Sequence, residues 1–179
     1  MEMETELRRQ LVHFIEADFL IREDVSGIHL IEGRGVSIDL LLFPRKHLAD
    51  SGFPQEWIGV EVKHIPCFRS GDSGKKSRLV WQAITYTQSL FDMGGEQIRP
   101  LFVLVYVGQD EFDEDEFGRD ARVKWIALLN LAWYANVGSM ITDARRGWII
   151  KFAGGVYYSQ CRGRGNVRLR DERLVGSIR

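Results

Sequence analysis

The sequence has few cysteines and no long apolar run, and both scarcities exclude classes of protein. Of 179 residues only two are cysteine, Cys67 and Cys161, and they lie far apart and outside any metal-binding spacing. A disulfide framework of the secreted type is therefore not expected. No apolar run approaches the roughly 20 residues of a membrane span, and the acidic start, Met1 to Glu4, lacks the basic region of a signal peptide. We expect a soluble, intracellular, cytoplasmic protein with no membrane partner.

The sequence also lacks an excess of either charge. It has 24 Lys and Arg against 25 Asp and Glu, for a formal net charge of −1. The total therefore argues neither for nor against nucleic acid, and only the distribution of charge is informative. Acidic residues gather at 110–116, which we expect to be a solvated loop facing away from DNA or a site for a basic protein partner. Basic residues gather at 69–78 and in the tail from Arg162, where the odds of DNA contact are even.

The order of expected elements predicts an α/β fold with a mixed central sheet flanked by helices. We expect a single domain over 1–179, with a core at 1–107 and a C-terminal helix, hairpin and basic tail at 121–179. Thr5 is the expected N-cap of the first helix, and Gly94 with Gly95 is expected to end the second. The predicted helices are 5–19, 78–93 and 123–137, and the predicted strands are 28–31, 36–43, 57–64, 101–107, 148–152 and 156–159.

Two of these strands carry charge in an apolar setting. Asp39 stands in the otherwise apolar run 36–43, and an ionised Asp there is costly unless it is paired or binds a metal. Glu61 and Lys63 alternate with two valines, so both charges lie on one face of their strand. Carboxylate and carbonyl oxygens suit Mg²⁺, so Asp39, Glu61 and the carbonyl of Val62 are the candidate ligands of Mg²⁺ or Mn²⁺. Such a site can hydrolyse a phosphodiester bond, with Lys63 orienting water or stabilising charge.

A third motif extends the pattern to a helix. Gln82 and Tyr86 are four residues apart, so they lie one above the other on one helix face. Asp39, then Glu61-x-Lys63, then Gln82-x-x-x-Tyr86 resembles the core signature of the PD-(D/E)XK nuclease superfamily, in its RecB and lambda-exonuclease-like branch. The resemblance covers residues 1–107. It implies a restriction-endonuclease-like three-layer core and a metal-dependent deoxyribonuclease, with Gln82 and Tyr86 supporting the catalytic residues.

The resemblance also implies a contribution from the first helix, for which three residues compete. Glu6 stands at the expected helix start, His13 follows seven residues later on the same face, and Glu16 is on another edge. We favour Glu6 as the further metal ligand. Ile38 precedes Asp39 where many members have proline, and the four-cysteine staple of some RecB-like members is absent, so no iron–sulfur cluster is expected.

The expected partner is DNA, bound through a mobile basic loop over the site. Its candidate contacts are Arg69, Lys75, Lys76 and Arg78. The expected role is that of an exonuclease or branched-DNA endonuclease in recombination, repair or phage DNA processing. The alternative is a non-catalytic module that binds nucleic acid or a partner on the same fold. Oligomeric state stays open, although the apolar helix at 123–137 offers an interface for a homo-oligomer.

Overall fold

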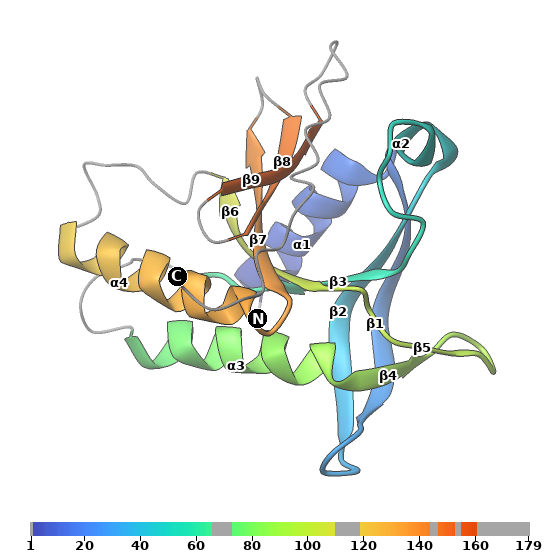
Figure 1. The fold of residues 1–179 in the computed structure, drawn as a ribbon, viewed down its shortest axis with the longest axis horizontal. Coiled ribbons are helices and arrows are strands. Elements are labelled where there is room, and N and C mark those ends of the chain that lie inside the picture. The colour runs from blue at the N-terminus through green and yellow to red at the C-terminus, as the bar shows by residue number, and fades with distance from the viewer. Residues whose placement is uncertain (1, 66–72, 110–118, 144–146, 153–154, 161–179) are drawn as a thin grey trace, which may run out of the picture.

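The structure, a computed structural model, describes residues 2–65, 73–109, 119–143, 147–152 and 155–160. Within these ranges nine strands form one mixed sheet with helices on both faces (Figure 1). The helices are α1 (Glu2–Ile15), α2 (Lys46–Asp50), α3 (Ser73–Thr87) and α4 (Arg119–Trp133). The strands are β1 (Phe19–His29), β2 (Gly35–Pro44), β3 (Ile58–Val62), β4 (Ser89–Asp92), β5 (Gln97–Ile98), β6 (Val103–Gln109), β7 (Val137–Asp143), β8 (Gly147–Phe152) and β9 (Gly155–Gln160). The predicted α/β class with a mixed central sheet is confirmed.

The sheet changes from antiparallel to parallel at β3. Its strand order is β5-β4-β1-β2-β3-β6-β7-β8-β9. β3 pairs antiparallel with β2 and parallel with β6, and β6 pairs parallel with β7. Parallel neighbours need a crossover connection, and α3 and α4 lie in the two connections that lead to β6 and β7. β3 is therefore the strand where the two halves of the sheet meet.

Apolar side chains on the two faces of the sheet form separate cores. On one face Leu11 and Ile15 of α1 pack with Val60 and Val62 of β3. On the other face α3 and α4 pack against strand residues that include Val105. In a strand, successive side chains point to opposite faces, so Glu61, which lies between Val60 and Val62, faces the α3 side.

The regular alternation of β2 breaks at Asp39. Leu40 lies in the α1 core, whereas Ile38, two residues earlier, lies in the α3/α4 core. The ladder between β1 and β2 shows no pair between Asp24 and Asp39, although the positions on both sides of them pair. Asp24 has φ +51, a left-handed conformation that Asp tolerates better than most residues. Asp39 thus stands at a local irregularity beside the end of β3.

Several element boundaries differ from the sequence predictions. α1 begins at Glu2 and ends at Ile15, so Thr5 is inside the helix, and Phe19 opens the long strand β1. α3 begins at Ser73 and not at residue 78, because its buried residues anchor the preceding turn to the sheet. The helix ends at Thr87, well before Gly94, since 89–91 pair with β1 and this tertiary pairing overrides the local helical pattern.

Three strands were missed, the predicted strand 28–31 coincides with only the last two residues of β1, and some predictions lie outside the described residues. β4, β5 and β7 are short or follow directly on a helix, so their apolar residues were assigned to helices or left in loops. The predicted hairpin near the C-terminus is confirmed as β8 and β9. Arg69, the acidic run 110–116 and the tail from Arg162 lie outside what the structure describes.

The predicted apolar helix at 123–137 is α4, shifted towards the N-terminus. Trp125 and Leu129 are buried against the sheet, whereas Val123 and Leu131 are exposed. The described side chains of α4 are therefore buried on one face of the helix only. Among the described helices none combines the length and the apolar character needed to cross a membrane.

The close approach of β1 and β4 makes Gly27 a sensitive position. A methyl group on Gly27 would overlap the carbonyl oxygen of Leu90 and lie 2.7 Å from Cδ1 of Phe91. We expect Gly27→Ala to lower the free energy of unfolding by about 2 kcal/mol, because backbone must move to accommodate it. Urea denaturation with an unchanged m-value measures this. Gly35→Ala is the matched control: a Cβ there meets nothing within 4 Å, and a change within about 0.5 kcal/mol is expected. Equal losses in the free energy of unfolding of Gly27→Ala and Gly35→Ala would contradict the close approach of β1 and β4 at Gly27.

Candidate metal centre

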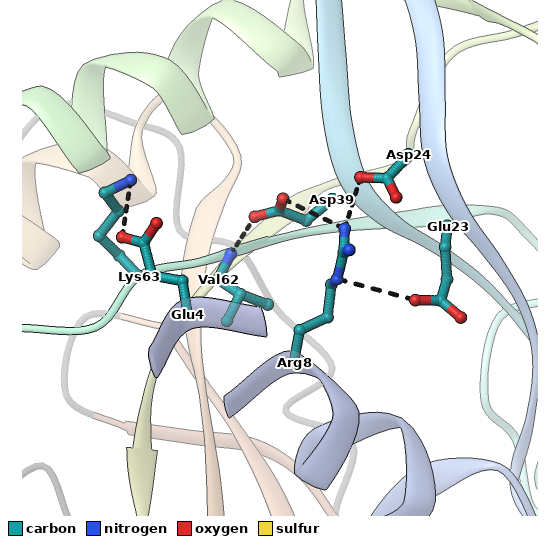
Figure 2. Close-up of polar contacts among 7 residues, drawn as sticks. All are labelled: Glu4, Arg8, Glu23, Asp24, Asp39, Val62 and Lys63. Atoms are coloured by element: carbon teal, nitrogen blue, oxygen red, sulfur yellow. Dashed lines mark hydrogen bonds and ion pairs between the residues drawn. The ribbon is translucent and has the colours of Figure 1, made fainter. Parts of the chain in front are cut away.

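The carboxyl groups of Asp39 and Glu61 lie together where β2 passes the end of β3. Asp39 Oδ2 accepts a hydrogen bond from the backbone N–H of Val62 at 2.7 Å (Figure 2). The side chain of Asp39 also hydrogen-bonds with that of Glu61. The contact with Val62 is made by its amide, so its carbonyl as a ligand stays a prediction. Two acids that the sequence placed on separate strands therefore form one group.

Glu61 is buried, and its environment favours the protonated carboxyl. Only 5% of the residue is exposed. Burial, then the charge of Asp39 and their hydrogen bond, raise the pKa of Glu61 to about 8, against an ordinary value of 4.5. Lys63 lowers this pKa and Glu4 raises it, so both charges reach the carboxyl. Two adjacent carboxylates without a cation repel each other, and in this pair a proton on Glu61 relieves the repulsion.

Helix α3 contributes Tyr86 and Gln82 to the same group. Tyr86 is 6% exposed, and its hydroxyl lies beside Glu61 and Gln82. Burial above all, followed by the charges of Glu61 and Asp39, raises the pKa of the Tyr86 hydroxyl, which therefore stays protonated and can donate. The structure thus brings Asp39, Glu61, Gln82 and Tyr86 into one polar group.

Helix α1 supplies a partner for Lys63. The Nζ atom of Lys63 lies 2.8 Å from Oε1 of Glu4 (Figure 2). Glu4 also accepts a hydrogen bond from the backbone N–H of His64. Burial raises the pKa of Glu4, but the bond and charge of Lys63 outweigh it, and the net pKa is lowered. Glu4 therefore fixes both the side chain of Lys63 and the backbone that follows it.

The second residue from α1 is Arg8, one helical turn after Glu4. Its Nη1 lies 3.8 Å from Oδ1 of Asp39 and bonds with Oδ1 of Asp24, while its Nε lies 3.7 Å from Oε2 of Glu23 (Figure 2). The Arg8 side chain is 20% exposed. Because these acids surround it, chiefly Asp24, the pKa of Arg8 is raised and its charge is permanent. Arg8 thus ties Asp39 to the irregular turn at Asp24.

None of the three first-helix residues proposed from the sequence reaches this group. The carboxylate of Glu6 bonds with Arg9 and Gln10 on the exposed side of α1. His13 and Glu16 pair with each other and are 87% and 59% exposed. The prediction that Glu6 completes the site is thus not matched by the structure, because the helix turns Glu6 away from the sheet.

Glu4 and Arg8 were missed, although the sequence contains a signal for them. Glu4, Arg8, Leu11 and Ile15 follow one another at spacings of four, three and four residues, which place them on one helix face. Leu11 and Ile15 are fully buried against the sheet. Charged residues in register with a buried apolar stripe face the sheet, and this criterion selects Glu4 over Glu6.

The proposed DNA contacts on α3 are partly described. Arg78 is exposed on the helix, and Lys75 and Lys76 lie in its first turns, with side chains outside the described set. They are therefore helical, which corrects the expected flexible loop, since the helix begins at Ser73.

The donor set fits a hard divalent cation in its chemistry but supplies few ligands. Asp39 and Glu61 offer carboxylate oxygens, and the proton that Glu61 retains marks a place where positive charge is favoured. Among the residues described, no group of three or more His, Cys, Asp or Glu side chains forms a cation site. Mg²⁺ commonly takes one or two carboxylates and completes its shell with water and substrate phosphate, so two carboxylates suffice.

The surrounding charges favour a cation as well. Carboxyl groups outnumber cationic groups around the pair, and this field attracts positive charge. The carboxyl groups are those of Glu4, Glu23, Asp24, Asp39 and Glu61, and the cations are Arg8 and Lys63.

Comparisons with protein-family models, with curated proteins and with solved structures find no significant match.

The raised pKa of Glu61 predicts a distinctive pH dependence of stability in metal-free protein. Folded protein holds the Glu61 proton up to about pH 8, whereas unfolded chain releases it near 4.5. The contribution of the Glu61 proton to the free energy of unfolding is therefore complete below pH 4.5. It falls as the pH rises to 8 and does not change further above pH 8. We expect Glu61→Gln to become progressively more stable than the parent over this window, by at most about 1.4 kcal/mol per pH unit.

Urea denaturation in EDTA at several pH values measures this difference. Glu56→Gln is the matched control, because it makes the same substitution at an exposed position. A parallel offset for both variants would show that Glu61 titrates normally.

Proposed function

We propose that the protein is a Mg²⁺- or Mn²⁺-dependent DNA nuclease with a PD-(D/E)XK-type core. The observation that carries this proposal is the network around Glu61. The network joins residues of two strands and one helix. Asp39 and Gln82 are 43 positions apart in the sequence, yet the residues of the network converge on the carboxyl groups of Asp39 and Glu61. Structural ion pairs rarely place two acids together in a buried position, because their mutual repulsion is costly.

The arrangement of the elements supports the same proposal. The acid-bearing strands β2 and β3 are antiparallel neighbours at the centre of the sheet. α1 packs on one face and α3 on the other, which supports the three-layer core that the resemblance implies. We therefore propose a restriction-endonuclease-like core over α1 to β6.

In the proposed reaction Asp39 and Glu61 hold the cation. When bound, it polarises a phosphoryl oxygen and lowers the pKa of water. Asp39 is fixed by the amide of Val62 and by Arg8, and Tyr86 holds Glu61 through its hydroxyl. These bonds orient both carboxylates before substrate arrives, so little reorganisation is needed on binding.

Lys63 is assigned the role of cationic donor to the phosphate. Its ammonium donates to Glu4 at 2.8 Å and is one-third exposed, with 34% of its side chain accessible. An accessible ammonium beside the carboxylate pair can stabilise the negative charge that develops as water attacks phosphorus. The bond between phosphorus and the leaving oxygen then breaks, and that oxygen takes a proton.

A non-catalytic module on the same fold is the second candidate. The observation in its favour is the small ligand set, two carboxylates without a third His, Cys, Asp or Glu in the described residues. DNA binding without cleavage under any metal condition would support it over the nuclease.

Cleavage assays test the proposal directly. We expect purified protein with Mn²⁺ or Mg²⁺ to cut at least one of linear, circular, single-stranded or branched DNA. Glu61→Ala and Lys63→Ala should abolish cutting with little loss of DNA affinity, because they remove cation binding and charge stabilisation. Glu6→Ala is the control from α1 and should cut normally. No cutting of any DNA form by the parent, or full activity of Lys63→Ala, would refute the proposal.

The contact between Glu4 and Lys63 predicts an intermediate effect. Glu4→Gln retains a hydrogen-bond acceptor but loses the charge that holds the ammonium. We expect kcat to fall roughly tenfold, about 1.4 kcal/mol of transition-state stabilisation, with KM nearly unchanged. Steady-state kinetics on the best DNA substrate measures both. A change in KM alone would indicate that Glu4 acts in substrate binding and does not position Lys63.

A further inference from the structure

One tryptophan lies exposed on α3, the helix that also carries Gln82 and Tyr86. All five tryptophans are in the described residues, and Trp81 is the one that is exposed, at 66%. Trp125 and Trp148 are 1% exposed. Trp81 directly precedes Gln82, which bonds with Tyr86 of the site. An indole left in solvent does not contribute to the core, so a different role has to be considered.

Helix geometry connects Trp81 to the site. Each residue turns the helix by about 100°, so Gln82 and Tyr86 lie about 100° and 140° around α3 from Trp81. Arg78, three residues earlier, and Thr85, four residues later, share the face of Trp81. Going around α3, the buried Tyr86 comes first, then Gln82, and then the exposed Arg78 and Trp81. The exposed ring therefore borders the same helix flank that builds the site.

The chemistry of this border suits one strand of nucleic acid. Aromatic rings stack on nucleobases, and an adjacent guanidinium binds the phosphate backbone. Trp81 has Arg78 and Thr85 on its own face, so the exposed apolar area is a single ring and not a broad patch of the kind that binds protein. The positive charge complements a phosphate strand.

We propose that Trp81, with Arg78, forms a stacking platform for an unpaired nucleobase of the strand whose phosphodiester enters the centre. This inference rests on the proposed nuclease function and deepens it. It makes single-stranded DNA, or a duplex with an unpaired end, the preferred substrate class. Stacking is tolerant of sequence, so little base preference is expected.

The test uses a labelled single-stranded oligonucleotide of mixed sequence, with binding followed by anisotropy in EDTA and cleavage followed with Mn²⁺. Trp81→Ala should weaken binding by roughly 5- to 100-fold, whereas Trp81→Phe, which keeps an aromatic face, should bind within about threefold of the parent. The oligonucleotide should quench the tryptophan fluorescence of the parent but not that of Trp81→Phe. Tyr134, which follows α4 and is 77% exposed, provides the control, and Tyr134→Ala should bind normally.

Two results would overturn the inference. If Trp81→Ala binds and cuts DNA as the parent does, the stacking platform is refuted and the nuclease proposal stands. A change of oligomeric state in Trp81→Ala by light scattering, with unchanged affinity for each protomer, would assign the ring to a contact between copies. If the parent binds the oligonucleotide with quenching but cuts no DNA, the platform stands and the nuclease proposal fails.

Discussion

The hydrogen bond between Asp39 and Glu61 is the interaction on which the rest of the site depends. Two adjacent carboxyl groups repel each other when both are ionised, and burial adds a penalty for the charge on Glu61. Burial and the neighbouring Asp39 raise the pKa of Glu61 to about 8, so Glu61 keeps a proton, while Tyr86 lies beside Glu61 and the Val62 amide and Arg8 contact Asp39. The proton takes the place of a divalent cation, and the hydroxyl, the amide and the guanidinium hold the neighbouring acids in position.

The fold places this pair where the sheet changes character. β3 is antiparallel to β2 and parallel to β6, and its carboxyl end leads directly to Lys63. In open α/β sheets, ligand sites form outside the carboxyl ends of strands where the topology switches. The broken alternation of β2 at Asp39, matched by the positive φ of Asp24, turns the acid towards that end. α1 and α3 then supply charged and polar side chains from opposite faces.

Local patterns were sufficient to predict the centre of this arrangement but not its border. Asp39 in an apolar strand and Glu61 with Lys63 in alternation were chosen from short-range periodicity, Gln82 with Tyr86 from the family resemblance, and the structure brings the four residues Asp39, Glu61, Gln82 and Tyr86 together. β4 and β7 were missed because long-range pairing decides them, as the pairing of 89–91 with β1 illustrates. Glu4 was not among the candidates Glu6, His13 and Glu16, because the helix was expected to start at Thr5, and the buried stripe of Leu11 and Ile15 was not used to orient it. Arg8 could be found only once Asp24 was known to face Asp39.

The central claim is that Asp39 and Glu61 form a cation site in which Glu61 carries a proton until a cation binds. Calorimetric titration of the protein with Mn²⁺ at pH 7 tests this claim. The account predicts saturable binding that releases close to one proton, seen as heats that vary with the ionisation enthalpy of the buffer, and loss of this binding in Asp39→Asn. Absence of a saturable site, or binding that Asp39→Asn leaves unchanged, would contradict it.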